Sequence, residues 1–110
     1  MKYRQSFGKW GEDLASKYLV DKGWKVIDRN ARTTHGEIDI IAEQDGTIIF
    51  VEVKTRSTQE FGYPEEAITS QKRKHLIHSA EEYLQNHPEI QSDWRIDVIA
   101  IRRLARITLL

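Results

Sequence analysis

The chain has 110 residues, no cysteine, and 17 lysine and arginine residues against 17 aspartate and glutamate residues. This length predicts one domain, residues 1–110, that buries a core without a disulfide or a structural metal, and the balanced charge gives no global support for a nucleic-acid partner. Because no apolar run approaches membrane-spanning length and the N-terminus lacks an apolar signal segment, we expect a soluble cytoplasmic protein with no membrane partner.

A helix is predicted over Ser6 to about Lys22. The apolar residues recur at helical spacing, and Gly23 supplies a C-terminal stop; the predicted stripe is Phe7, Trp10, Leu14, Ala15, Tyr18 and Leu19. Gly8 and Gly11 cost helix stability, which suggests a close backbone approach, with fraying of the first turn as the alternative. Glu12 lies at the edge of the predicted stripe. Taken alone, Glu12 is better explained by electrostatics at the helix start; it becomes a site candidate only if the helix packs over the charged face of the hairpin.

A short strand is predicted from Trp24 to about Arg29, and a polar connection from Asn30 to His35. The stretch from Gly36 to Arg56 then has the sequence pattern of a β-hairpin. Two runs rich in isoleucine and valine flank Asp45-Gly46, the strongest short-range hairpin signal, so we expect two antiparallel strands.

A two-residue turn at Asp45-Gly46 fixes the pairing of the two strands. Extended to the ends of the strands, this register places Asp39 opposite Glu52 and Glu37 opposite Lys54, on one face with Ile41 and Phe50. The other face, which includes Ile38 and Ile40, is predicted to be core. Opposed carboxylates are destabilising, so a divalent cation between Asp39 and Glu52, with Lys54 beside it, is one interpretation; a solvated strand face is the other.

After Arg56 comes a loop marked by Ser57, Gly62 and Pro64, in which Phe61 and Tyr63 either anchor the loop or stack on bases. A second helix is predicted to start between Glu65 and Ser70 and to end near Asn86. Its predicted core stripe is Leu76, Ile77, Ala80, Tyr83, Leu84 and His87. The same spacing turns Lys72 toward the core edge, whereas Arg73 and Lys74 are expected to be solvated.

The segment from Arg95 to Ile101 is apolar enough for a buried strand, and it should lie parallel to the Thr47–Thr55 strand because a helix connects the two. A last short edge strand is predicted over Arg106 to Leu109. The expected fold is therefore an α/β domain of order α-β-β-β-α-β, with a mixed sheet flanked by helices and an extra C-terminal edge strand.

One carboxylate on the first hairpin strand and E-x-K on the next, in this order of elements, resemble the PD-(D/E)XK superfamily of restriction-endonuclease-like nucleases. More closely, the chain resembles the YraN-type family of small bacterial predicted endonucleases, which is similar in layout to Holliday-junction resolvases. The matching stretches span nearly the whole chain: GKWGEDLASKYL, GEIDIIA, FVEVKTR, the Lys72 region before HLIHSAEEYL, and RIDVIAI. Ile38 stands where the superfamily's proline would be.

The resemblance implies a restriction-endonuclease-like fold and a metal-dependent endonuclease. It implies that Asp39 and Glu52 bind the metal, that Lys54 completes the catalytic set, and that Glu12 is the helix carboxylate many such nucleases bring to the site.

The chemistry agrees with those roles. Hard oxygen ligands select Mg2+ or Mn2+, and two carboxylates with the Val53 carbonyl are enough protein ligands. Glu12 and Glu37 are candidates for a second metal or for polarising water, while Glu37 in the derived register can instead hold the Lys54 ammonium. Arg56 and Lys72 are expected to contact phosphates.

We therefore expect an endonuclease that acts on DNA, structure-selective because no sequence-reading element is visible. The alternatives are a nucleic-acid-binding module that keeps the fold without efficient cleavage, and a structural domain in which the acidic pair is vestigial. The small size suggests that a homodimer or another partner is needed to cover enough DNA.

Overall fold

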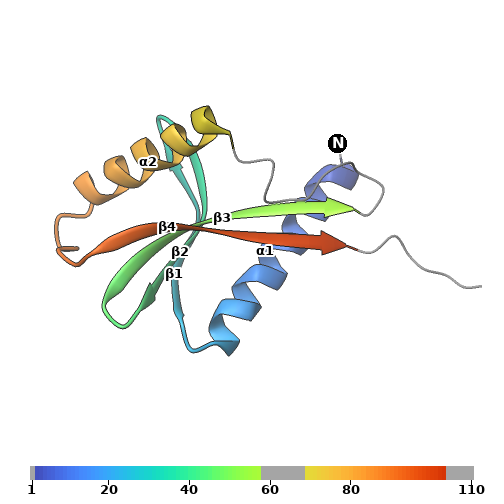
Figure 1. Ribbon diagram of the computed structural model, residues 1–110, viewed down its shortest axis with the longest axis horizontal. Coiled ribbons are helices and arrows are strands. Elements are labelled where there is room, and N and C mark those ends of the chain that lie inside the picture. Colours follow the sequence, from blue (N-terminus) through green and yellow to red (C-terminus); the bar gives the residue numbers. More distant parts are fainter. Residues whose placement is uncertain (1, 58–68, 104–110) are drawn as a thin grey trace, which may run out of the picture.

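The computed structural model describes residues 2–57 and 69–103. The predicted loop residues Phe61 and Tyr63 and the predicted strand Arg106 to Leu109 lie outside these ranges. The elements follow in the order α1 (Lys2–Asp21), β1 (Lys25–Thr33), β2 (Gly36–Gln44), β3 (Thr47–Ser57), α2 (Ser70–Gln85) and β4 (Trp94–Arg103). This is the predicted α-β-β-β-α-β order, so the α/β fold class is confirmed (Figure 1).

The described strands form one four-stranded mixed sheet of order β1-β2-β3-β4. Neighbours β1 and β2, and β2 and β3, are antiparallel, whereas β3 and β4 are parallel over the whole length of β4. The predicted parallel crossover through the second helix is therefore confirmed. It makes β4 an edge strand, hydrogen-bonded to β3 alone in the described part of the chain.

Two backbone signals in the sequence act as predicted. After α1, Gly23 at φ 91° allows its own N–H to donate to Val20 and the Trp24 N–H to donate to Leu19, which closes the helix end. In the hairpin, Asp45 and Gly46 both have positive φ, 50° and 82°, as a two-residue type I′ turn requires. That turn pairs Gln44 with Thr47.

The predicted polar connection from Asn30 to His35 is wrong over most of its length. β1 continues to Thr33, because residues 29–33 pair with residues 36–40 of β2. Only Thr34 and His35 separate the two strands. Backbone pairing with an already well-marked strand outweighs the polar side chains, which is the usual way tertiary context overrides strand propensity.

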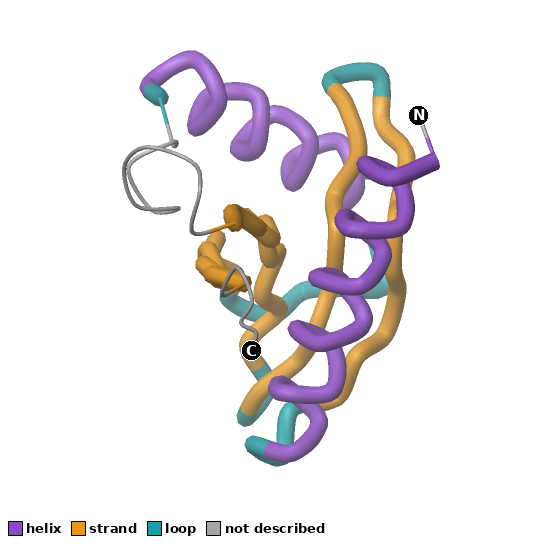
Figure 2. Tube along the Cα trace, turned by 90° about the vertical axis from the view of Figure 1, so that its right-hand side faces the viewer, coloured by secondary structure: helices purple, strands orange, loops and turns teal. Residues whose placement is uncertain are grey.

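The two helices cover opposite faces of the sheet (Figures 1 and 2). On the α1 face, Ala15 and Leu19 pack in one cluster with buried side chains of β2 and β3: Ile40, Ala42, Ile49 and Val51. On the α2 face, Ala80 and Tyr83 pack in a second cluster with Ile38, Ile41, Ile48 and Phe50. The hairpin face that carries Ile41 and Phe50 therefore forms a second core, away from the charged residues at one end of that face.

The helix stripes differ in part from the predicted ones. Trp10, Leu14 and Tyr18 are exposed, since α1 instead turns Gly11, Ala15 and Leu19 to the sheet. Leu76, Ala80 and Tyr83 of α2 are buried as predicted, together with Ser79, while Ile77 is exposed. Among the described residues, no helix combines the length and apolar character needed to cross a membrane.

Candidate functional site

The candidate site begins where β2 and β3 part. Their ladder matches the predicted register from Gln44–Thr47 to Ile40–Val51 and ends there. Beyond it, Asp39 turns its side chain into the gap, and its Oδ2 accepts a hydrogen bond of 2.8 Å from the Val53 N–H. The predicted opposition of Glu37 to Lys54 is wrong, because Glu37 pairs with Arg32 of β1 and the strands are already apart.

The same departure explains Ile38. In a regular strand Ile38 and Ile40 share a face, as predicted, yet Ile38 packs in the α2 cluster and Ile40 in the α1 cluster. The change of face falls on Asp39. The strand therefore presents Asp39 at the fork rather than on either core face.

A cavity of about 530 Å³ opens at this fork. Most of the predicted site residues line this cavity, and they come from α1, β2 and β3: Glu12, Asp39, Glu52, Val53, Lys54 and Arg56. Phe7, Gly8 and Thr55 complete the lining. Glu37 and Lys72 do not line it, but each has a polar contact to a group at its edge, described below.

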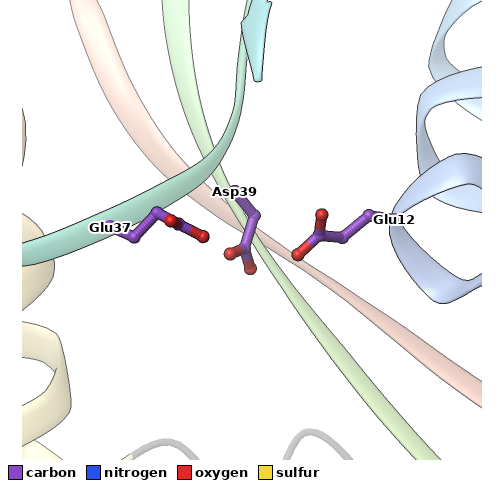
Figure 3. A group of neighbouring side chains, drawn as sticks. All are labelled: Glu12, Glu37 and Asp39. Atoms are coloured by element: carbon purple, nitrogen blue, oxygen red, sulfur yellow. The ribbon is translucent and has the colours of Figure 1, made fainter. Parts of the chain in front are cut away.

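Three carboxylates converge at the cavity. Oxygens of Glu12, Glu37 and Asp39 all lie within 4.8 Å of one another, which is close enough for one cation to bridge them. Figure 3 shows Glu12 reaching in from α1 while Glu37 and Asp39 approach from β2, with their carboxylates turned toward each other. Sequence reasoning named all three residues but did not predict this particular group.

Glu52 lies beside this group rather than in it. Its side chain is almost fully buried and forms ion pairs with Lys54 at 3.6 Å and with Lys72 at 3.3 Å. The predicted orientation of Lys72 toward the core edge is confirmed by this contact. Because α2 carries Lys72 and β3 carries Glu52, the ion pair between these two residues links the second helix to the site.

The charges at the fork strongly perturb Asp39. Burial, followed by the negative charge of Glu52, raises the pKa of the Asp39 carboxyl from 3.8 to about 7; Glu12 adds to the rise, while the Val53 N–H and Lys72 oppose it. Perturbed carboxyls of this kind concentrate at functional sites. A cation close to such a carboxyl would favour its ionised form.

Helix α1 brings Glu12 to the site by a close contact with β3. A β-carbon on Gly11 would lie 2.2 Å from Thr55 Oγ1, so only glycine lets the helix approach this closely. Glu12, the next residue, therefore stands over the fork. Because α1 begins at Lys2, Glu12 is in the middle of the helix, and helix-start electrostatics does not explain it.

Asn30 is a polar residue at the site that the sequence does not single out. Its Nδ2 donates to Glu12 Oε1 at 2.9 Å and to Glu37 Oε1 at 3.1 Å. Next to it, Arg29 Nη2 lies 2.8 Å from Asp13 Oδ1 and 3.9 Å from Glu12 Oε1. The signal was hidden because residues 30–35 have the composition of a loop, and nothing local in the sequence places Asn30 near Glu12.

The residues present fit a hard divalent cation. Carboxylate oxygens dominate the donor set, and the described residues offer neither cysteine nor histidine within the converging group. Burial, and after it the negative charges of Glu52 and Glu12, raise the pKa of Asp39, and a cation beside Asp39 would offset both effects. Mg2+ or Mn2+ therefore suits this site better than a soft metal.

Comparison with known proteins gives a consistent family match. The model of the "Uncharacterised protein family UPF0102" matches residues 11–101. A UPF0102 protein of Syntrophotalea carbinolica is 46% identical over 91% of this chain and 81% of its own length. Similar UPF0102 proteins are found in Syntrophomonas wolfei, at 44% identity over 88% of this chain and 84% of the relative, and in Prosthecochloris aestuarii, at 50% over 86% and 74%.

Proposed function

Given that the chain belongs to the uncharacterised protein family UPF0102, we propose that it is a metal-dependent endonuclease that hydrolyses phosphodiester bonds of DNA. The observation that carries the proposal is the fork itself. Carboxylates from a helix and from two strands gather there around one cavity that also holds Lys54 and Arg56. We further propose that the chain is a member of the PD-(D/E)XK superfamily, with Asp39, Glu52 and Lys54 as its signature residues.

Asp39 and Glu52 are the proposed metal ligands, with the Val53 carbonyl as a third. Asp39 is already fixed by its hydrogen bond from the Val53 N–H, so its free oxygen stays available to a cation. Glu12 and Glu37, whose oxygens converge on Asp39, are proposed to hold a second cation or to polarise water. A bound Mg2+ or Mn2+ neutralises charge that develops on the phosphoryl oxygens and lowers the pKa of an attacking water.

Lys54 is the proposed partner of the reacting phosphate. Its ammonium lies 3.6 Å from Glu52 and its side chain is largely buried, so it is positioned before substrate binds. A positioned ammonium can orient the attacking water or hold a phosphate oxygen, and it costs no reorganisation during the reaction. Lys54 is therefore the residue whose loss should stop cleavage while leaving the carboxylates in place.

Basic residues continue from the cavity along the sheet. The parallel register of β3 and β4 sets Arg56 beside Arg102, a neighbour that sequence reasoning did not assign to the site. We propose that Arg56, Arg102 and Lys72 contact backbone phosphates, which positions a strand without reading its sequence and suits a structure-selective enzyme.

The proposal is tested by a cleavage assay with matched variants. The protein is incubated with branched, flapped and linear DNA in Mg2+ and in Mn2+, beside Asp39→Ala, Lys54→Ala and, as a charge-matched control, Lys25→Ala at the exposed start of β1. We expect cleavage of the branched DNA by the wild type and by Lys25→Ala, and none by the other variants. Equal cleavage in all four proteins would remove Asp39 and Lys54 from the mechanism.

A second candidate is a nucleic-acid-binding module that does not cleave efficiently. One observation favours it: the Glu52 carboxylate is paired with two lysines and stands apart from the converging acidic group. Binding of the same DNA without cleavage in either metal would support this candidate and overturn the first.

A further inference from the structure

We propose that Asn30 is a positioning residue of the cation site. Its side chain holds Glu12 and Glu37 in place to receive the cation. This inference rests on the proposed function, in which Glu12 and Glu37 hold a second cation beside the one at Asp39 and Glu52. Asn30 occurs in the middle of β1, a strand whose other described residues have no positive φ. Its own φ of 54° lies in the left-handed region, which asparagine tolerates better than most residues.

The amide of Asn30 is used to its full donor capacity. An asparagine side chain carries two N–H bonds, and Nδ2 donates to one oxygen of Glu12 and to one oxygen of Glu37, at 2.9 and 3.1 Å. These acceptors belong to α1 and β2, while Asn30 belongs to β1. A single side chain therefore links three elements at the point where the carboxylates converge.

The register explains why Asn30 is in reach of both groups. The pairs on either side of it are Arg29–Ile40 and Ala31–Ile38, so Asn30 lies across from Asp39. Asp39 is the third member of the acidic group within 4.8 Å. The amide thus contacts Glu12 and Glu37, the other two members of the group.

The neutral charge of the amide is the central point. Carboxylates this close repel one another, and without a donor between them they would separate in the metal-free protein. A lysine in the place of Asn30 would relieve the repulsion but would also neutralise part of the negative charge that attracts a cation. An amide aligns the oxygens without adding a positive charge to that of Arg29, which lies 3.9 Å from Glu12 Oε1. Groups that orient metal ligands in this way commonly contribute 10- to 100-fold to affinity.

Mn2+ affinity of the full chain, measured by isothermal titration calorimetry, tests the inference. In Asn30→Gly the backbone adopts the positive φ without strain, so the variant removes the amide while the backbone conformation is kept. We expect its dissociation constant for Mn2+ to rise about 10-fold or more. In the cleavage assay, the Mn2+ concentration for half-maximal rate should rise similarly, while the rate at saturating Mn2+ stays near that of the wild type.

Asn30→Asp provides the second variant. It keeps the shape and the tolerance of positive φ but replaces the donor by a fourth carboxylate, so we expect a lower melting temperature without metal at pH 8 and a larger rise on adding Mn2+ than in the wild type. If Asn30 served the backbone conformation alone, Asn30→Gly would match the wild type in Mn2+ affinity, and that result would overturn the inference. Failure of the wild type itself to bind Mn2+ would overturn the proposed function as well, so the two failures are distinguishable.

Discussion

Asp39 is affected by burial, by a backbone hydrogen bond and by the charges of several neighbours at once. It is partly buried at the fork, accepts a hydrogen bond from the Val53 N–H, and lies near the negative charges of Glu52 and Glu12. These neighbours raise its pKa to about 7, so near neutral pH the metal-free protein carries a carboxyl that is only partly ionised. Protons and cations then compete for the same oxygen atoms, and both stability and metal affinity should depend on pH.

The sign of the stability effect follows from linkage. The unfolded value is about 4, so a folded pKa of about 7 means that the folded state binds the proton more tightly. That stabilisation is complete below pH 4 and is lost as pH rises through 7, by up to about 4 kcal/mol. Between pH 5 and pH 8, in EDTA, the free energy of unfolding of the wild type should therefore fall relative to that of Asp39→Asn.

Urea unfolding of the two proteins at both pH values measures this difference. The asparagine keeps an oxygen for the Val53 N–H, so the comparison isolates the titrating group. An equal change of unfolding free energy with pH in both proteins would contradict the assignment of the raised pKa to Asp39.

Arg56 and Arg102 give a second prediction at the scale of single residues. Because phosphate contacts release counterions from DNA, Arg56→Gln and Arg102→Gln should each weaken DNA binding and lower the slope of log affinity against log salt by about 1. Fluorescence anisotropy across a salt series measures both quantities. Arg73→Gln, on the exposed side of α2, is the charge-matched control. A loss of affinity as large in Arg73→Gln would mean that general charge, rather than the β3–β4 pair, attracts DNA.

At the scale of elements, the site depends on three placements: the hairpin turn, the parting of β2 and β3, and the approach of α1. The first could be predicted, since Asp-Gly between apolar runs has a mechanism in its backbone angles. The second could not, because extending a register assumes a regular strand, and the side chain of Asp39 replaces backbone pairing at Val53. The two glycines of α1 suggested the third, but only the structure shows that Gly11, and not Gly8, meets β3.

Substitution of Gly11 tests how α1 is placed. In Gly11→Ala the new methyl group would lie 2.2 Å from Thr55 Oγ1, so the helix must shift, and we expect a loss of about 1–3 kcal/mol in the free energy of unfolding and weaker Mn2+ binding through displaced Glu12. Gly8→Ala is the matched control in the same helix. With nothing within 4 Å of its added carbon, it should gain up to about 1 kcal/mol from helix propensity.

Thermal and urea unfolding of the two variants provide the measurement. Adding Thr55→Ala to Gly11→Ala removes the hydroxyl that the methyl group meets and should restore part of the lost stability. If both single variants changed stability alike, helix propensity would explain Gly11 and the close approach to β3 would not matter.

For the whole molecule, the order of elements and the class of fold were predictable. Each element is marked by a local signal, namely the spacing of its apolar residues and the turn or helix-ending residues at its ends. Among the residues that line the cavity, Asp39, Glu52 and Lys54 could be singled out by their charge within apolar strands, whereas Glu12 was singled out by the family resemblance. The grouping of the carboxylates around one point could not be predicted from the sequence. It arises from contacts between α1, β1 and β2, such as those of Asn30 with Glu12 and Glu37, which join residues far apart in the sequence.

A cation that binds this site should stabilise the entire fold, because the site draws on helix and sheet together. At a free concentration 100 times its dissociation constant, Mn2+ should add about 2.7 kcal/mol to the free energy of unfolding, and EDTA should reverse the effect. Asp39→Ala and Glu12→Ala should reduce the rise in melting temperature, measured by differential scanning calorimetry. A wild-type melting temperature insensitive to Mn2+ and Mg2+ would contradict a cation site at the fork.

The most direct measurement is single-turnover cleavage of a labelled four-way DNA junction by the wild type and by Lys54→Ala, each saturated with Mn2+ as judged by calorimetry. The proposed function predicts that the variant still binds Mn2+ and the junction but cleaves at least about 100-fold more slowly, since positioned charge at a phosphoryl centre contributes a factor of this order. Cleavage at the wild-type rate by Lys54→Ala, or no cleavage by the metal-loaded wild type, would contradict it.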